Sequence, residues 1–176
     1  MERRAGWVAG FRTWQWTPED PLTLYSVLTT APGHEWAGWR RDGPTRATCY
    51  GKTRCGSTLL LPIELGDDVL HSTTPPQAAC RCGLHAWHRL GDCILYERGP
   101  WHGVTGAVLG WGRTFIYAEG WRAEFARVIA LVQDPDLPVD ALARAYCAAV
   151  AGRDALEAYA LEFGERAPEA AAPRAA

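Results

Sequence analysis

Four cysteines and one histidine gather between residues 49 and 82, and they constrain the fold of this chain more than any other feature. They are Cys49, Cys55, His71, Cys80 and Cys82. Thiolate sulfur and imidazole nitrogen are the ligands that Zn²⁺ prefers, and a structural zinc ion is held by four of them. The cluster therefore predicts a zinc site that ties the 47–83 segment to the rest of the fold. Five residues are candidate ligands for the four coordination positions of the zinc ion.

The ligand types favour a structural metal over a catalytic one. Catalytic zinc sites keep an open position beside a general base, and histidine and carboxylate ligands dominate them. The remaining histidines have no serine, cysteine or carboxylate at a spacing typical of a catalytic triad; they are His34, His85, His88 and His102. Without metal, the cluster would be a set of buried thiols with a surface histidine. A small enzyme that uses the zinc or a cysteine is our second hypothesis.

The chain is long and apolar enough to fold around a core of its own. It has 176 residues, of which 48% are hydrophobic, which is typical of one domain with a short appendage. Zinc would then support the fold locally. The formal net charge of −2 argues against a protein that mainly binds a phosphate backbone. An accessory nucleic-acid-binding factor is therefore only the third hypothesis, and it requires the arginines at 40, 41, 46, 54 and 81 to share a face with exposed tryptophans.

The N-terminal segment and the six cysteines of the chain indicate a cytoplasmic protein. Residues 1–10 lack the apolar run of a signal peptide, and no apolar stretch of the sequence is long enough to cross a membrane. Thiols in a reducing compartment are more often metal-bound or catalytic than oxidised. Cys93 and Cys147 lie within apolar runs and are expected to be buried thiols.

Apolar and polar residues alternate from Val8 to Trp16, which is the period of a β-strand. Trp14 and Trp16 share one face of this strand, and Phe11 and Thr13 share the other. Further strands are expected at 22–28, 59–63, 84–90 (or a helical turn there) and 104–117. Glycines within the last of these indicate a bend or the close approach of another backbone. The sequence therefore predicts a curved, mainly antiparallel sheet.

Beyond residue 139 the apolar residues recur at helical spacing. Leu142, Tyr146, Ala149 and Val150 define one short helix, and Leu156 to Phe163 define a second. The predicted fold is α+β: a zinc-stabilised β-rich domain over residues 1–133, C-terminal helices over 134–165 and a disordered tail over 166–176.

Several motifs follow one another in a fixed order over residues 7–130. They are Gly10-Phe-Arg-Thr-Trp14, Ala47-Thr-Cys49, His71 with Pro75-Pro76, Cys80-Arg-Cys82-Gly83-Leu84-His-Ala86, Gly106-Ala-Val-Leu-Gly-Trp-Gly112 and Gly120-Trp-Arg-Ala-Glu124. This order resembles that of a group of small uncharacterised bacterial proteins, frequent in actinobacteria. Those proteins carry H-x-x-P, C-x-C-G-(I/L)-Y-A, G-x-V-x-L-W-G and G-(W/Y)-R-A-(E/K). The order of the motifs makes the resemblance specific, since each short piece alone is weak.

The resemblance implies a ligand set for the zinc but no activity. The matched positions are Cys49, His71, Cys80 and Cys82, which leaves Cys55 as the spare. Two departures are visible: His85 stands where the group has an aromatic residue, and residues 114–117 are less polar than in the group. The helical C-terminal part lies outside the resemblance.

Aromatic residues and one charged segment suggest a recognition surface. The chain has nine tryptophans, which either fill a thin core or line a partly exposed pocket. The Gly120–Glu124 segment carries both charge signs beside an aromatic ring; it is either a strand-end turn with a surface ion pair or a binding element. We predict a binding or adaptor module that recognises a protein or a small-molecule ligand through Trp111, Trp121, Arg122 and Glu124.

Overall fold

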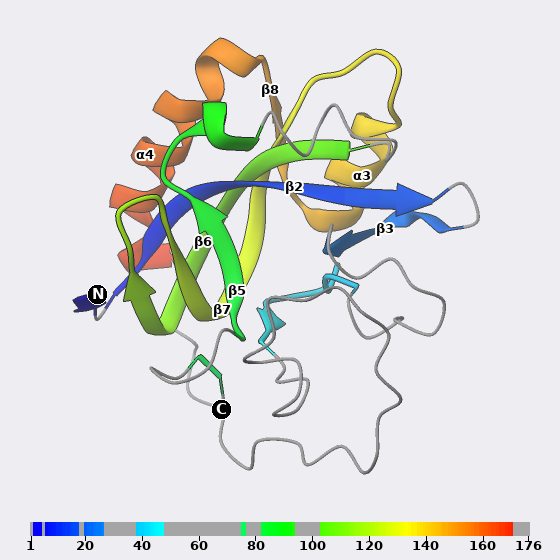
Figure 1. Ribbon diagram of the computed structural model, residues 1–176. Coiled ribbons are helices and arrows are strands. Elements are labelled where there is room, and N and C mark those ends of the chain that lie inside the picture. Colours follow the sequence, from blue (N-terminus) through cyan, green and yellow to red (C-terminus); the bar gives the residue numbers. More distant parts are fainter. Residues whose placement is uncertain are drawn as a thin grey trace, which may run out of the picture.

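A strongly curved β-sheet dominates the protein (Figure 1). The structure is a computed structural model that describes residues 2–4, 6–17, 20–26, 38–47, 75–76, 82–93 and 103–170. Its strands are β1 (Glu2–Arg4), β2 (Val8–Thr17), β3 (Asp20–Ser26), β4 (Thr45–Arg46), β5 (Leu84–Trp87), β6 (Gly103–Ile116), β7 (Gly120–Val132) and β8 (Ala149–Ala151). A 3₁₀ turn, η2 (Leu90–Cys93), and the helices α3 (Val139–Tyr146) and α4 (Arg153–Ala170) accompany them. The predicted α+β class with a curved, mainly antiparallel sheet is confirmed. The described residues do not test whether zinc pins the loop.

The long strands β6 and β7 form the centre of the sheet and pair with each other along most of their length. The other edge of β6 carries β2 and β1. The other edge of β7 carries three short strands end to end: β5, β4 and β8. Among the described strands only β8 runs parallel to its partner. Segments from far apart in the sequence therefore meet along β7.

One end of the sheet closes on itself, because β5 pairs with both β2 and β7. Trp121 fills this closed end with only 2% of its surface exposed, and its indole Nε1 donates a hydrogen bond to the Ala9 carbonyl (2.9 Å). A Cβ atom at Gly10 or Gly110 would collide with the Trp121 ring. The strand glycines thus allow the backbone to approach a large ring closely, as their position in the sequence indicates.

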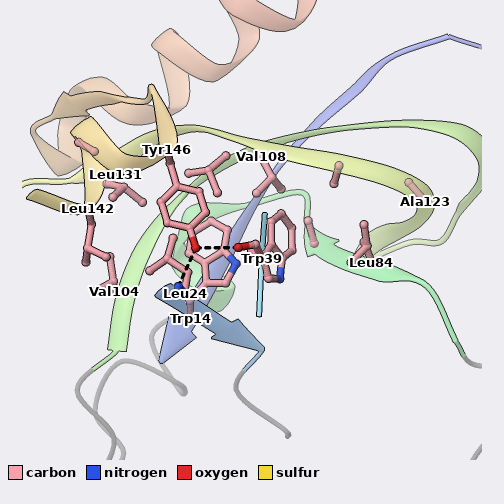
Figure 2. Close-up of a cluster of buried hydrophobic side chains, with 14 of the residues drawn as sticks. Trp14, Leu24, Trp39, Leu84, Val104, Val108, Ala123, Leu131, Leu142 and Tyr146 are labelled. Atoms are coloured by element: carbon pink, nitrogen blue, oxygen red, sulfur yellow. Dashed lines mark hydrogen bonds between the residues drawn. The ribbon is translucent and has the colours of Figure 1, made fainter. Parts of the chain in front are cut away.

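The inner face of the sheet and α3 enclose one hydrophobic cluster (Figure 2). Trp14 is fully buried there and meets Trp39 edge to face, with 5.3 Å between ring centroids. The Tyr146 hydroxyl donates to the Trp39 carbonyl (2.9 Å) and accepts from the Leu24 amide (2.8 Å). This buried hydroxyl connects α3 to β3 and to the 38–47 segment.

A second cluster lies on the outer face, beneath α4 and η2. Phe11 and Leu109 from the sheet pack with Leu156 and Ala160 from α4, and Figure 1 shows α4 alongside β2. The two faces of β2 therefore carry the side chains predicted for them. No helix in the described ranges is long and apolar enough to cross a membrane.

Three sequence predictions differ from the structure. The Gly120–Glu124 segment is the start of the 13-residue strand β7 rather than a turn; most of β7 is buried on both faces, so the alternation typical of a strand is missing. The first helix ends at Tyr146 because Cys147 takes a left-handed conformation (φ 50°). Residues Ala149–Ala151 then pair with β7 as a strand.

The cysteine and tail predictions have mixed outcomes. Cys93 is fully buried as expected, but Cys147 is exposed at the end of α3, since the helix stops there. Helix α4 continues to Ala170, into the segment predicted as a disordered tail. The strand predicted at 59–63 lies outside the described residues.

Candidate functional site

The predicted zinc ligands fall mostly outside the residues that the structure describes. Cys49, His71 and Cys80 are outside them, as is Cys55, and Cys82 is inside. Cys82 is buried, with 8% of its surface exposed, two residues before β5. Within the described ranges no group of three or more His, Cys, Asp or Glu side chains is placed to hold a metal ion. The ligand set therefore stays a prediction.

The described residues on either side of the predicted metal segment lie next to each other on β7. The chain leaves the sheet at Ala47, whose amide donates to the Glu124 carbonyl (2.7 Å). It returns at Leu84, which pairs with Ala123. Because β6 occupies the opposite edge of β7, β4 and β5 share one edge and the 48–83 segment begins and ends at adjacent positions.

Two arginines on β6 and β7 contact the end of this segment. Arg122 donates from Nη1 to the Cys82 carbonyl (3.3 Å), and Arg113 donates from Nη1 to the Pro76 carbonyl (3.5 Å). Arg122 is 5% exposed, and its guanidinium lies over the rings of Phe115 (5.2 Å) and Tyr117 (5.3 Å). The sequence does not indicate this burial.

Trp121 and Arg122, predicted as an exposed recognition pair, are both inside the protein. Since β7 continues through them, Trp121 points into the closed end and Arg122 points to the opposite side, beneath the segment that contains Cys82. Neither side chain offers an accessible surface to a partner. The expectation of an exposed pair is not met.

Trp111 belongs to a partly buried row of aromatic side chains on the outer face. Its ring lies 4.3 Å from Trp7 and 6.0 Å from Phe125, centroid to centroid, and the rings of Trp111 and Phe125 are stacked. The Arg46 guanidinium lies over the Phe125 ring, 5.7 Å from its centroid. We call Trp7, Trp111, Phe125 and Arg46 the aromatic row; it crosses β6, β7 and β4 and reaches the residue before β2.

Glu124 borders the aromatic row at a β-bulge between β6 and β7. Its carboxylate lies 3.6 Å from Arg46 Nη2 and accepts a 3.4 Å hydrogen bond from the Arg113 amide. The Arg46 side chain is 60% exposed and that of Glu124 17%. Of the two alternatives for this segment, the strand-end turn with a surface pair of Arg122 and Glu124 does not hold, since Glu124 lies against Arg46 and Arg122 is buried.

A shallow depression of about 490 Å³ lies beside β3, away from the aromatic row. It is lined by Thr23, Gly38, Trp39, Arg40, Arg41 and Asp42. Arg40 binds Asp42 (3.1 Å), and this hydrogen-bonded ion pair lowers the pKa of the Asp42 carboxyl and raises the pKa of Arg40. Trp39 is 3% exposed, so it offers no open ring, and Arg54 and Arg81 lie outside the described residues.

Sequence reasoning missed Trp7 and Phe125, and it considered Arg46 only for nucleic-acid binding. Phe125 lies in a strand whose two buried faces hide the alternating pattern, and Arg46 reaches Phe125 only through the pairing of β4 with β7. If the pairing of β6 with β7 were known, Phe125 opposite Trp111 would indicate a cross-strand aromatic pair and hence the row.

Comparisons with known proteins add nothing to this description. No protein-family model, curated protein or solved structure matches the chain. The resemblance to the bacterial group therefore stays a prediction.

Proposed function

We propose that the protein is a zinc-stabilised recognition module that binds a protein or small-molecule partner through the aromatic row. The observation that carries this proposal is the row itself: three partly exposed rings and an exposed guanidinium, supported by the two longest strands of the sheet. Aromatic residues and arginine are the types that concentrate binding energy at interfaces. A sheet holds them in place before binding, which lowers the entropic cost of association.

Charge at the end of the row supports a specific contact. Arg46 is mostly exposed, and its Nη2 lies 3.6 Å from the partly exposed carboxylate of Glu124. Such a pair contributes little to folding. Arg46 can exchange Glu124 for a carboxylate or carbonyl of a ligand, because its guanidinium presents several donors in one plane.

Two features support zinc as the element that fixes the neighbouring segment. The first is the donor set of three cysteines and a histidine. The second is chain connectivity: Ala47, two residues before Cys49 in the sequence, and Leu84, two residues after Cys82, occupy adjacent positions on β7.

The recognition proposal is tested by Trp111→Ala and Trp7→Ala. Partners captured by the wild-type protein from an extract of its source organism are identified, purified and titrated against each variant. We expect both variants to weaken binding at least about tenfold, as truncation of a central interface aromatic does. The control is Trp87→Ala, a partly buried tryptophan on β5 outside the row. Equal affinity for wild type and Trp111→Ala would show that the row only stabilises the sheet.

The zinc proposal is tested separately, by elemental analysis and cobalt substitution. We expect about one zinc ion per chain, and its loss in Cys82→Ser together with cooperative unfolding, since the free energy of metal binding is also free energy of folding. Cys147→Ser, which changes an exposed thiol, is the control. His71→Ala should weaken the metal more than Cys55→Ser; a four-sulfur cobalt spectrum that changes on removal of Cys55 would reverse the ligand assignment. Metal-free protein that melts like the untreated sample would overturn the structural role.

A further inference from the structure

The rings of the aromatic row use their faces for contacts within the protein. Trp111 stacks with Phe125, and Trp7 meets Trp111 at a tilt of 38° with 4.3 Å between centroids. Trp7 comes from the β2 side of β6 and Phe125 from the β7 side, and the Arg46 guanidinium lies over the Phe125 ring. A ligand at this surface therefore meets mainly ring edges and guanidinium groups.

A second arginine lies on the same face of the sheet, beside the row. Ala126 and Val128 belong to the inner cluster, so the alternation of the strand places Arg127 between them on the outer face, as it does Phe125. Arg127 is partly exposed. Within the described ranges no carboxylate forms an ion pair with it. The positive charge of Arg127 is therefore not offset by a neighbouring carboxylate in the described part of the chain.

The pairing of β4 with β7 brings the two arginines within reach of one anion. Arg46 lies opposite Phe125, and Thr45 lies opposite Ala126. Arg46 and Arg127 are therefore diagonal neighbours on one face, and such neighbours are about 7–8 Å apart, a distance that long side chains bridge. The edges of aromatic rings carry the positive part of the ring quadrupole, which adds to the charge of the guanidinium groups. This part of the surface thus favours a negatively charged group.

We propose that the partner of the aromatic row is an acidic peptide segment, with an Asp or Glu carboxylate bound between Arg46 and Arg127 and an adjacent apolar side chain against Trp111. The inference rests on the proposed recognition function and adds the chemical class of the partner. A guanidinium matches a carboxylate with two parallel N–H donors. A nucleic acid is less favoured, because its bases need open ring faces for stacking and the chain has a net charge of −2.

The test starts from a phage-displayed library of random peptides selected on the wild-type protein. Selected peptides are synthesised and titrated by fluorescence anisotropy against wild type, Arg46→Gln and Arg127→Gln. We expect the peptides to share an Asp or Glu next to an apolar residue, and each substitution to weaken binding about tenfold. The matched control is Arg144→Gln, an exposed arginine of α3, which packs on the inner cluster. This control should bind like wild type.

A double-mutant cycle separates direct contact from a structural role. The peptide carboxylate is replaced by the corresponding amide, and both peptides are titrated against wild type and each arginine variant. We expect the two changes to deviate from additivity by about threefold or more, since they remove the same contact. Full additivity would show that the arginines do not touch the carboxylate and would overturn the inference. If Arg127→Gln does not fold, Arg46→Gln carries the same comparison, since its side chain is 60% exposed.

Further outcomes distinguish this inference from the recognition proposal. Selected peptides without acidic residues that lose affinity for Trp111→Ala would overturn the acidic partner and leave recognition by the row intact. The same holds for a labelled single-stranded oligouridylate that binds through these arginines more tightly than the peptides do. A library that yields no peptide able to distinguish wild type from Trp111→Ala would overturn both proposals.

Discussion

The inner and outer sides of the sheet use tryptophan in opposite ways. Trp121 is enclosed at the closed end and donates its indole N–H to the Ala9 carbonyl. Trp111 lies on the other side of the sheet, stacks with Phe125, contacts Trp7 at a tilt and keeps part of its surface accessible. The residue type is the same, and the direction of the side chain decides which one can support the fold and which one can meet a partner. The predictions below test this difference.

The largest effect is expected for Trp121→Ala. Removing the ring leaves a large cavity at the closed end, because the glycines at 10 and 110 have no side chains to fill it. We expect a loss of about 3–5 kcal/mol in the free energy of unfolding, measured by urea denaturation. A loss below about 1 kcal/mol would show that the closed end does not depend on this ring.

Tyr146→Phe should have the next largest effect. The substitution keeps the ring but removes the hydroxyl that binds Trp39 and Leu24, and it leaves the Leu24 amide buried without that acceptor. We expect a loss of about 1–3 kcal/mol by the same measurement. The control is Tyr117→Phe on the surface, 37% exposed, for which the change should stay below about 0.5 kcal/mol. Equal losses for the two variants would contradict the structural role of the Tyr146 hydroxyl.

Trp111→Ala should cost less stability than either. Its contacts with two neighbouring rings, one stacked and one tilted, are worth about 0.5–1.5 kcal/mol beyond burial, and the partly exposed site relaxes more easily than a core. Trp111→Phe, which keeps an aromatic ring, should recover part of this loss. A destabilisation as large as that of Trp121→Ala would assign Trp111 to the core and remove the aromatic row from consideration as a recognition surface.

The smallest effect concerns the exposed pair Arg40 and Asp42. Hydrogen bonding to Arg40 lowers the pKa of Asp42. The associated stabilisation is present above the ordinary carboxyl pKa of about 3.9 and is lost as the pH falls through the lowered value. In Arg40→Gln, NMR titration should show the pKa of Asp42 rising towards its ordinary value, while the melting temperature at neutral pH stays the same within error. An unchanged pKa would indicate that the pair does not persist in solution.

The sequence by itself predicted the strand in which apolar and polar residues alternate, and the strand glycines that let another part of the chain approach the backbone closely. The two faces of β2 follow from a period of two residues, which is a local property. The length of β6 follows from a long apolar run interrupted by glycines. The sequence did not predict β7, whose buried faces remove that two-residue period, or β8, which is a strand only because β7 offers an open edge. Such pairing depends on residues far away in the chain.

For the candidate site, residue chemistry singled out residues 111 and 121–124 but did not show which of their side chains are accessible. Trp121, Arg122 and Glu124 are consecutive or nearly so, yet strand geometry sends Trp121 into the closed end and Arg122 beneath Cys82. Glu124 meets Arg46 only because β4 pairs with β7. Composition therefore determined which chemical groups the protein possesses. Only the tertiary structure decided which of them are accessible, because burial depends on strand register and sheet curvature, and both are set by contacts between distant residues.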